Sequence, residues 1–154
     1  MLQNYRKGIG AIILNEQGLV FIGKRIDTPN AWQMPQGGLD LNETYKAALL
    51  RELQEEIGTN KIEILYKTPL LTYNLPEELQ PNFWGGKYTG QQQQWFFTKF
   101  LGTDSSINLN AHIPPEFCEW QWIHYQKLID IIIPFKKPMY EEIIKLGIEY
   151  GVFV

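Results

Sequence analysis

The chain has 154 residues, and 44% of them are hydrophobic, which is enough apolar material for the core of one domain. We therefore expect a single domain over residues 1–154. The formal net charge is −3, which argues against a protein that holds nucleic acid through a broad basic surface but leaves local recognition of one nucleic-acid end open.

The apolar runs and the cysteine content indicate the cellular compartment in which the protein is expected. No apolar run approaches the roughly 20 residues of a membrane-spanning helix, so we expect no membrane segment. The first residues lead into strand-like sequence without an apolar stretch and cleavage site, so we expect no signal peptide. Cys118 is the single cysteine and cannot form an internal disulfide. A cytoplasmic monomer with no stable protein partner is the simplest interpretation.

The chain begins with strands and turns. Residues 8–14 and 19–24 have the composition of strands, and residues 15–18 form the hairpin turn between them. Residues 28–30 break the chain. Residues 32–38 are then predicted to be a short extended piece that enters a flexible glycine loop.

The first clear helix is predicted over about residues 44–57. Asp40 and Asn42 are available as N-terminal caps, and Gly58 supplies the stop.

The second half of the chain mixes strands with one further helix. Strands are predicted at residues 62–71, 94–101 and 119–124, and an amphipathic helix at about residues 138–150. Residues 74–90 are rich in Pro and Gly and are expected to be irregular. Because strands and helices do not alternate regularly, the pattern favours an α+β fold or a layered mixed sheet over a doubly wound one.

Three carboxylates stand out on the first helix. At about 100° per residue, Leu53 and Ile57 lie on the face that packs on a core, and Glu52, Glu55 and Glu56 lie nearly opposite. Such a cluster repels itself when unpaired. A hard divalent cation such as Mg²⁺ reverses this, because it prefers oxygen ligands. The helix is therefore predicted to bury one side and to present a metal site on the other.

The spacing of these residues resembles a known signature. The match to the Nudix box, G-x5-E-x7-R-E-U-x-E-E-x-G-U with U a bulky apolar residue, consists of Gly37, five intervening residues, Glu43, seven intervening residues, and Arg51-Glu52-Leu53-x-Glu55-Glu56-x-Gly58. Only the final apolar position departs, because Thr59 stands there. The departure affects a packing position and no proposed ligand.

The resemblance implies a fold, a reaction and a set of roles. The fold is an α/β/α sandwich around a mixed sheet, with a catalytic loop-helix-loop at about residues 37–59, and the reaction is Mg²⁺- or Mn²⁺-dependent hydrolysis of a nucleoside diphosphate linked to another group. Glu52, Glu55 and Glu56 would bind metal or act as the base. A backbone carbonyl of Gln36 or Gly37 would be a further ligand. Glu43 and Arg51 would hold the loop and the helix together.

Motifs outside the box are similar to one subgroup of the family, the bacterial RNA pyrophosphohydrolases and the asymmetric dinucleoside polyphosphate hydrolases. They are Tyr5-Arg6 before Gly10, Gly23-Lys24-Arg25, residues 32–38, Gly90-Gln91 with Trp95-Phe96, Pro115-Glu116-Phe117 with Trp120 and Trp122, and Phe135-Lys136 before Tyr140. This resemblance implies that Glu116 reaches the metals as an additional carboxylate.

A polyphosphate substrate also needs cations and a surface for its bases. Charge-assisted hydrogen bonds to phosphate are strong, and basic side chains can supply them. Candidates for this clamp are Arg6, Lys24, Arg25 and Lys87. Tyr73 and Tyr88 can stack on a base or donate to phosphate, with core packing as the alternative role. Phe135 and Lys136 resemble the segment that contacts RNA bases near the 5′ end.

Three functions remain open on the sequence. The first is removal of pyrophosphate from the 5′-triphosphate end of RNA, which leaves 5′-monophosphate RNA and promotes mRNA decay. The second is hydrolysis of diadenosine tetraphosphate to ATP and AMP. The third is a non-catalytic nucleotide-binding module. Such a module usually lacks one of the acids of the box, and here all of them are present.

Overall fold

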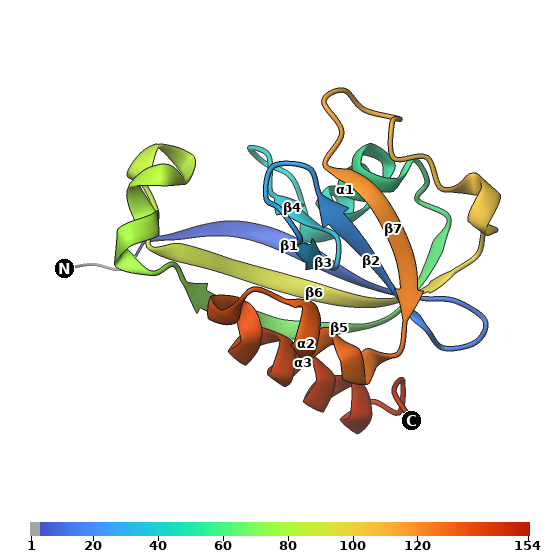
Figure 1. The fold of residues 1–154 in the computed structure, drawn as a ribbon. Coiled ribbons are helices and arrows are strands. Elements are labelled where there is room, and N and C mark those ends of the chain that lie inside the picture. The colour runs from blue at the N-terminus through green and yellow to red at the C-terminus, as the bar shows by residue number, and fades with distance from the viewer. Residues whose placement is uncertain (1–3) are drawn as a thin grey trace.

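A mixed β-sheet runs through the molecule, with helices on both of its faces (Figure 1). The computed structural model describes residues 4–154. The strands are β1 (Tyr5–Leu14), β2 (Val20–Arg25), β3 (Trp32–Gln33), β4 (Gln36–Gly38), β5 (Ile62–Asn74), β6 (Gly90–Phe100) and β7 (Phe117–Ile123). The α-helices within this part of the chain are α1 (Tyr45–Ile57), α2 (Leu128–Ile131) and α3 (Lys137–Glu149).

The strand order is β3-β2-β1-β6-β5, with β4 also pairing with β1 and β7 with β2. The β1–β6 pair is parallel and the other pairs are antiparallel. β1 pairs with β2 at Leu14 and with β4 along residues 8–10. Strand β1 therefore pairs with β2, β4 and β6, and its pairing with β4 places that short strand beside the centre of the sheet.

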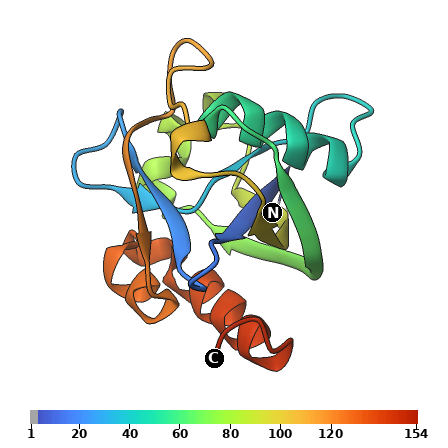
Figure 2. The ribbon, with the colours of Figure 1, turned by 90° about the vertical axis from the view of Figure 1, so that its right-hand side faces the viewer.

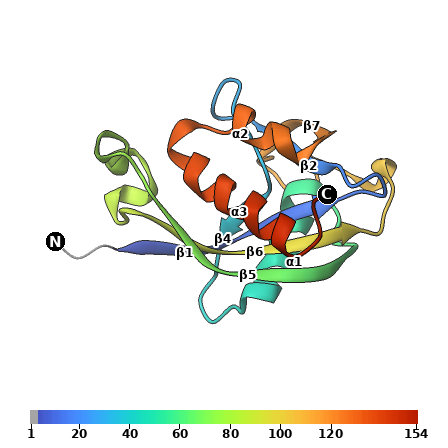
Figure 3. The same cartoon turned by 90° about the horizontal axis from the view of Figure 1, so that it is seen from below.

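The two faces of the sheet carry separate cores. On one face, α1 buries Leu49 and Leu53 against Ile9 and Phe96. On the other, α3 packs Ile143 with Trp95 and many other apolar side chains. Figures 2 and 3 show the two helices on opposite sides of the strands. The expected α/β/α arrangement is therefore confirmed. Each fully buried large apolar side chain contributes roughly 1.5–3 kcal/mol.

The ends of α1 follow their local chemistry, but its cap differs from the expected one. The hydroxyl of Thr44 accepts a hydrogen bond from the Ala47 amide at 3.1 Å, so Thr44 is the N-cap. Asp40 and Asn42 lie farther back in the loop, and the prediction that one of them caps the helix is wrong. Gly58 ends the helix in the left-handed region at φ 77°, as predicted.

Several element bounds also differ from the sequence-based expectation. Residues 36–38 form strand β4, not a flexible loop, because β1 offers an unpaired edge there. The strand predicted from residue 94 begins at Gly90, and the first strand begins at Tyr5. The short helix α2 was not predicted. Residues 77–86 contain two 3-10 turns within the irregular segment. Among residues 4–154, no helix has the length and apolarity needed to cross a membrane.

Candidate active site

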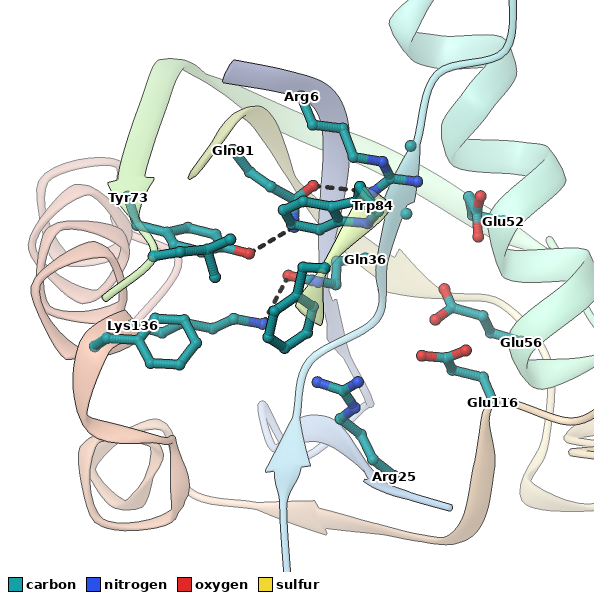
Figure 4. A pocket seen from close by; sticks show the side chains of 15 residues that line it. Arg6, Arg25, Gln36, Glu52, Glu56, Tyr73, Trp84, Gln91, Glu116 and Lys136 are labelled. Carbon is teal, nitrogen blue, oxygen red and sulfur yellow. Dashed lines mark hydrogen bonds between the residues drawn. The ribbon is translucent and has the colours of Figure 1, made fainter. Parts of the chain in front are cut away.

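A polar pocket of about 310 Å³ lies between α1, β4 and the segment that precedes α3 (Figure 4). Acidic side chains come from the α1 side and cationic side chains from the sheet and the α3 side. The lining residues are Arg6, Arg25, Gln36, Gly37, Gly38, Glu52, Glu56, Tyr73, Leu75, Phe83, Trp84, Gln91, Glu116, Phe135 and Lys136.

Arg51 ties the loop before α1 to the helix. Its guanidinium donates two hydrogen bonds to Glu43, at 2.8 and 2.9 Å, and one to the Gly38 carbonyl at 2.8 Å. The same side chain donates to Glu52 at 2.8 Å and to Glu55 at 3.3 Å. This bidentate pairing, together with the Asp40 amide, lowers the pKa of Glu43 to about 2. Arg51 therefore fixes the positions of two carboxylates of the helix.

Glycine at position 37 makes room for the first of these carboxylates. A Cβ on Gly37 would lie 2.0 Å from the carboxyl carbon of Glu52. The backbone of β4 and the Glu52 side chain are thus in direct contact. Burial raises the pKa of Glu52, and the hydrogen bond from Arg51 opposes that rise.

Glu56 is the most deeply buried acid of the pocket. This residue is only 4% exposed, and neither of its carboxylate oxygens has a hydrogen-bond partner among residues 4–154. Burial raises its pKa well above the usual range, and the charges of Glu52 and Glu116 add to the rise. Glu56 is therefore buried, although helix periodicity places it on the face opposite Leu53 and Ile57. Periodicity describes the faces of an isolated helix, and here β4 and neighbouring segments cover the acidic face.

Glu55 remains the accessible member of the group, with its side chain 35% exposed, whereas that of Glu52 is 14% exposed. Glu55 does not line the pocket, and its carboxylate lies against Arg51. Glu116, just before β7, also lines the pocket, and Figure 4 shows its carboxylate beside that of Glu56. A residue distant in the sequence thus joins the acids of the helix.

These acids fit a divalent cation. Within residues 4–154 no group of three or more His, Cys, Asp or Glu side chains is arranged as a ready-made metal site. Arg51 is the hydrogen-bond donor to Glu52 and Glu55 in this structure. The two unpartnered oxygens of Glu56, however, are buried acceptors that a hard cation would satisfy. Glu52 and Glu116 line the same pocket and are suited to share such an ion.

Two guanidinium groups on the cationic side of the pocket are held in place by neighbouring side chains. Arg6 on β1 donates to the side-chain oxygen of Gln91 at 3.1 Å, and its guanidinium lies 5.1 Å from the centre of the Trp84 ring. Arg25 at the end of β2 makes a two-point ion pair with Asp27, at 2.9 and 2.7 Å. Both guanidinium groups are therefore oriented before any ligand binds.

Lys136 is a cation in an unusually dry position. The residue is only 3% exposed, and its ammonium group donates weakly to Gln33 at 3.5 Å and to Gln36 at 3.4 Å. It also lies 5.3 Å from the ring centre of Tyr73. Burial and the nearby charge of Arg25 lower its pKa to about 7. An anion entering the pocket would favour its charged form.

Other candidates from the sequence lie elsewhere. Lys24 precedes Arg25 on β2, at a step where the pairing with β7 is irregular, and it does not line the pocket. Lys87 is exposed, and its carbonyl accepts a hydrogen bond from Asn4. Tyr88 contacts Trp84 edge-on, with ring centres 6.1 Å apart, and also lies outside the lining. The structure therefore supports a smaller clamp than the sequence suggested.

Residues that sequence reasoning did not assign to the site complete its wall. Trp84 and Phe83 come from the irregular segment after β5, and Gln91 comes from the start of β6. The available signal was the Gly90-Gln91 motif, which was noted without a role. Tyr73, considered for stacking, lies 5.8 Å from Phe135 between ring centres. The two rings line the pocket together.

The chain was compared with known proteins. Residues 4–143 match the family model described as "NUDIX domain". An RNA pyrophosphohydrolase of Erythrobacter litoralis is 47% identical over 146 residues, covering 92% of this chain and 89% of the relative. One from a Wolbachia of Brugia malayi is 49% identical over 142 residues, covering 92% and 88%.

Solved structures share the fold at low sequence identity. The Escherichia coli dihydroneopterin triphosphate pyrophosphohydrolase superposes with a TM-score of 0.71 at 16% identity, covering 92% of this chain and 97% of the other. A binary complex of the Caenorhabditis elegans Ap4A hydrolase gives a TM-score of 0.67 at 17% identity, covering 92% and 96%. Together with the match over residues 4–143, these findings show that the chain belongs to the Nudix hydrolase family.

Proposed function

We propose that this protein is an RNA pyrophosphohydrolase that removes pyrophosphate from the 5′-triphosphate end of RNA and leaves 5′-monophosphate RNA. The observation that carries the proposal is one pocket that holds buried carboxylates on one side and oriented cations on the other. A phosphoanhydride substrate with a divalent cation needs carboxylates to hold the cation and basic side chains to bind the phosphates. The names of relatives that are 47–49% identical over most of the chain support RNA as the substrate. The product feeds mRNA decay, which places the enzyme in the cytoplasm.

Glu52, Glu56 and Glu116 would hold the cation, with Glu55 and the backbone carbonyl of Gly37 as further candidates. Mg²⁺ fits this oxygen donor set, and Mn²⁺ can take its place. When bound, such an ion cancels charge on phosphate oxygens and lowers the pKa of coordinated water.

The chain's own residues then bind and orient the substrate. Arg6, Arg25 and Lys136 donate to phosphate oxygens, and the arginines bring the planar donor geometry that phosphate favours. Phe135 offers its ring to a base near the 5′ end. Arg51 and Glu43 keep the acidic helix and β4 in register.

One of the acids also has to accept a proton from the attacking water. Glu55, Glu56 and Glu116 are the candidates, since each is a carboxylate in or beside the pocket. A base must be unprotonated to act, so its titration sets the low-pH limb of the profile of kcat against pH. Comparing these profiles for the three Gln variants identifies the residue whose loss removes that limb.

The substrate assignment is tested by initial rates at equal, low concentrations of a 5′-triphosphorylated oligoribonucleotide, free ATP and diadenosine tetraphosphate. The proposal predicts that the RNA is hydrolysed fastest. If RNA reacts no faster than free ATP, the RNA assignment is abandoned. Faster cleavage of diadenosine tetraphosphate would instead assign the enzyme to the dinucleoside polyphosphate hydrolases.

A further inference from the structure

Gln91 lies between Arg6 and Tyr73 on three neighbouring strands. In the registers of the sheet, Gln91 on β6 is the partner of Arg6 on β1 and of Tyr73 on β5. Side chains that are directly opposite on adjacent strands share one face of a sheet. The three side chains therefore form a row that borders the pocket (Figure 4). We call Arg6, Gln91 and Tyr73 the cross-strand row.

The hydrogen bonds of the cross-strand row have a fixed direction. The Arg6 guanidinium can only donate, so the oxygen of the Gln91 carboxamide accepts its hydrogen bond. The carboxamide nitrogen must then face Tyr73, and it donates to the tyrosine hydroxyl. Gln91 is completely buried, so water does not compete for these bonds. Arg6 thereby sets which way the amide of Gln91 points.

This direction determines what the Tyr73 hydroxyl can do. Its oxygen accepts from Gln91, and the side chain of Gln36, which also lines the pocket, is a second hydrogen-bonding neighbour of the hydroxyl. Because Gln91 donates to this oxygen, the hydroxyl proton points away from Gln91 and toward the pocket. The ring is 7% exposed and is held by Phe135 and by Lys136, so the hydroxyl has little freedom to move.

We propose that Gln91 is a positioning residue, which holds the guanidinium of Arg6 and directs the hydroxyl proton of Tyr73 into the pocket so that both donate to phosphate oxygens of the substrate. This inference rests on the proposed function, because it takes a polyphosphate to be the ligand of the pocket. Gln91 itself makes no contact with the substrate. Its effect passes through its two neighbours in the row.

The Gln91→Glu variant separates the two roles of Gln91, which are to hold Arg6 and to orient the hydroxyl of Tyr73. A carboxylate has only acceptor atoms, so it still accepts from Arg6 but must also accept from Tyr73. The tyrosine proton then points at residue 91 and is withdrawn from the pocket. Tyr73→Phe removes the same proton and keeps the ring contacts. The two substitutions should therefore act on one hydrogen bond and fail to add.

The experiment measures kcat and KM on 5′-triphosphorylated RNA for wild type, Tyr73→Phe, Gln91→Glu and the double variant. A lost hydrogen bond to a charged group raises KM by about tenfold. We expect this rise for Tyr73→Phe, with kcat almost unchanged. In the Gln91→Glu background, adding Tyr73→Phe should change KM by less than about twofold. If Tyr73→Phe raises KM equally in both backgrounds, the inference is overturned.

Folding and substrate identity are controlled separately. Gln92→Leu, whose side chain leaves the next position of β6 toward the opposite face, should keep wild-type KM and kcat. Near-UV circular dichroism checks that each variant keeps the tertiary packing of the wild type. If Gln91→Glu does not fold, Gln91→Met gives the same test, because it also removes the donor that orients Tyr73. A Tyr73→Phe penalty that disappears in Gln91→Met supports the inference, and an unchanged penalty overturns it.

A binding measurement distinguishes this inference from the proposed function. The affinity for a non-hydrolysable α,β-methylene nucleoside triphosphate is measured by calorimetry for the same variants. If wild type does not hydrolyse RNA, the proposed function fails, and the calorimetry still tests the row. Non-additive losses of affinity support the role of Gln91, whereas additive losses refute it.

Discussion

The carboxyl group of Glu52 lies against the backbone of Gly37, so closely that a Cβ on Gly37 would be 2.0 Å from the carboxyl carbon. Gly37 belongs to strand β4, and Glu52 is also bound by Arg51 at 2.8 Å. Strand and helix are therefore joined at the position where the acidic side of the pocket begins. Any side chain at position 37 must displace the carboxylate.

The Gly37→Ala variant should lose activity and keep its fold. The atoms that a Cβ would meet are the far end of a flexible side chain, so Glu52 can move aside with little loss of stability. The moved carboxylate leaves the geometry that catalysis needs. We expect kcat to fall by about 100-fold and the midpoint of thermal unfolding to change little.

Gly18→Ala is the matched control. Gly18 has φ 76° in the turn after β1, and no atom of residues 4–154 lies within 4 Å of its Cβ position. The substitution should cost about 1 kcal/mol of stability and leave kcat unchanged. If Gly37→Ala retains wild-type kcat, the close approach to Glu52 has no catalytic role.

Glu56→Gln tests the buried acid. The amide replaces a buried carboxyl group that has no hydrogen-bond partner in the described residues, so the metal-free variant should be at least as stable as wild type. Saturating Mg²⁺, at 100 times its Kd, should stabilise wild type by about 2.7 kcal/mol. The variant should lose most of this gain, and kcat should fall by about 100-fold or more.

Thermal unfolding with and without Mg²⁺ measures both effects. Glu141→Gln, an exposed acid on α3, is the control and should behave as wild type. Equal Mg²⁺ stabilisation of wild type and Glu56→Gln would remove Glu56 from the metal site.

The burial of Glu56 also shows where sequence reasoning reaches its limit. The spacing of Glu52, Glu55 and Glu56 on a helix that ends at Gly58 was sufficient to predict α1 and its chemistry. Periodicity could not show that a strand as short as β4 covers the acidic face, because that depends on an edge left free by β1. Local patterns predict an element, whereas burial depends on what packs against it.

Lys136→Met tests the buried cation. The pKa of Lys136 is lowered to about 7 from 10.5, so between these pH values the unfolded chain binds a proton that the folded protein does not. Stability of wild type therefore rises with pH through this window. The Met variant should be more stable by on the order of 1–3 kcal/mol below pH 7, and the gain should fade toward pH 10.5.

Denaturant unfolding at pH 6.5 and pH 9.5 measures this difference. Lys145→Met, on the exposed side of α3, should show no such pH-dependent gain. The same Lys136 variant should bind the α,β-methylene nucleoside triphosphate more weakly. A stability gain that is equal at both pH values would contradict the lowered pKa.

Glu43→Gln tests the ion pair with Arg51. The pKa of Glu43 is lowered to about 2 from 4.5, so its contribution to stability is present above pH 4.5 and is lost as the pH falls toward 2. Wild type should therefore exceed Glu43→Gln in thermal stability at pH 6, and the difference should shrink at pH 3.5. Glu63→Gln, an exposed position on β5, provides the control. A difference that does not depend on pH would argue against the pair.

The cross-strand row was not accessible from the sequence for a different reason. Arg6 and Gln91 are 85 residues apart, and Tyr73 and Gln91 are 18 apart. Each was visible as a motif or as a candidate, but their adjacency depends on the parallel pairing of β1 with β6 and on the register of β5. Strand order and register are tertiary properties, and one residue of slip would turn Gln91 to the other face.

We propose that the acidic and cationic sides of one pocket act together when pyrophosphate is released from an RNA 5′ end. RNA labelled at either the α- or the γ-phosphate, incubated with Mg²⁺ and wild-type or Glu56→Gln enzyme, tests this joint role. We expect wild type to release the γ label as pyrophosphate and to keep the α label on monophosphorylated RNA, and Glu56→Gln to leave both labels on triphosphorylated RNA. Release of the γ label as orthophosphate, or equal rates for the two enzymes, would contradict it.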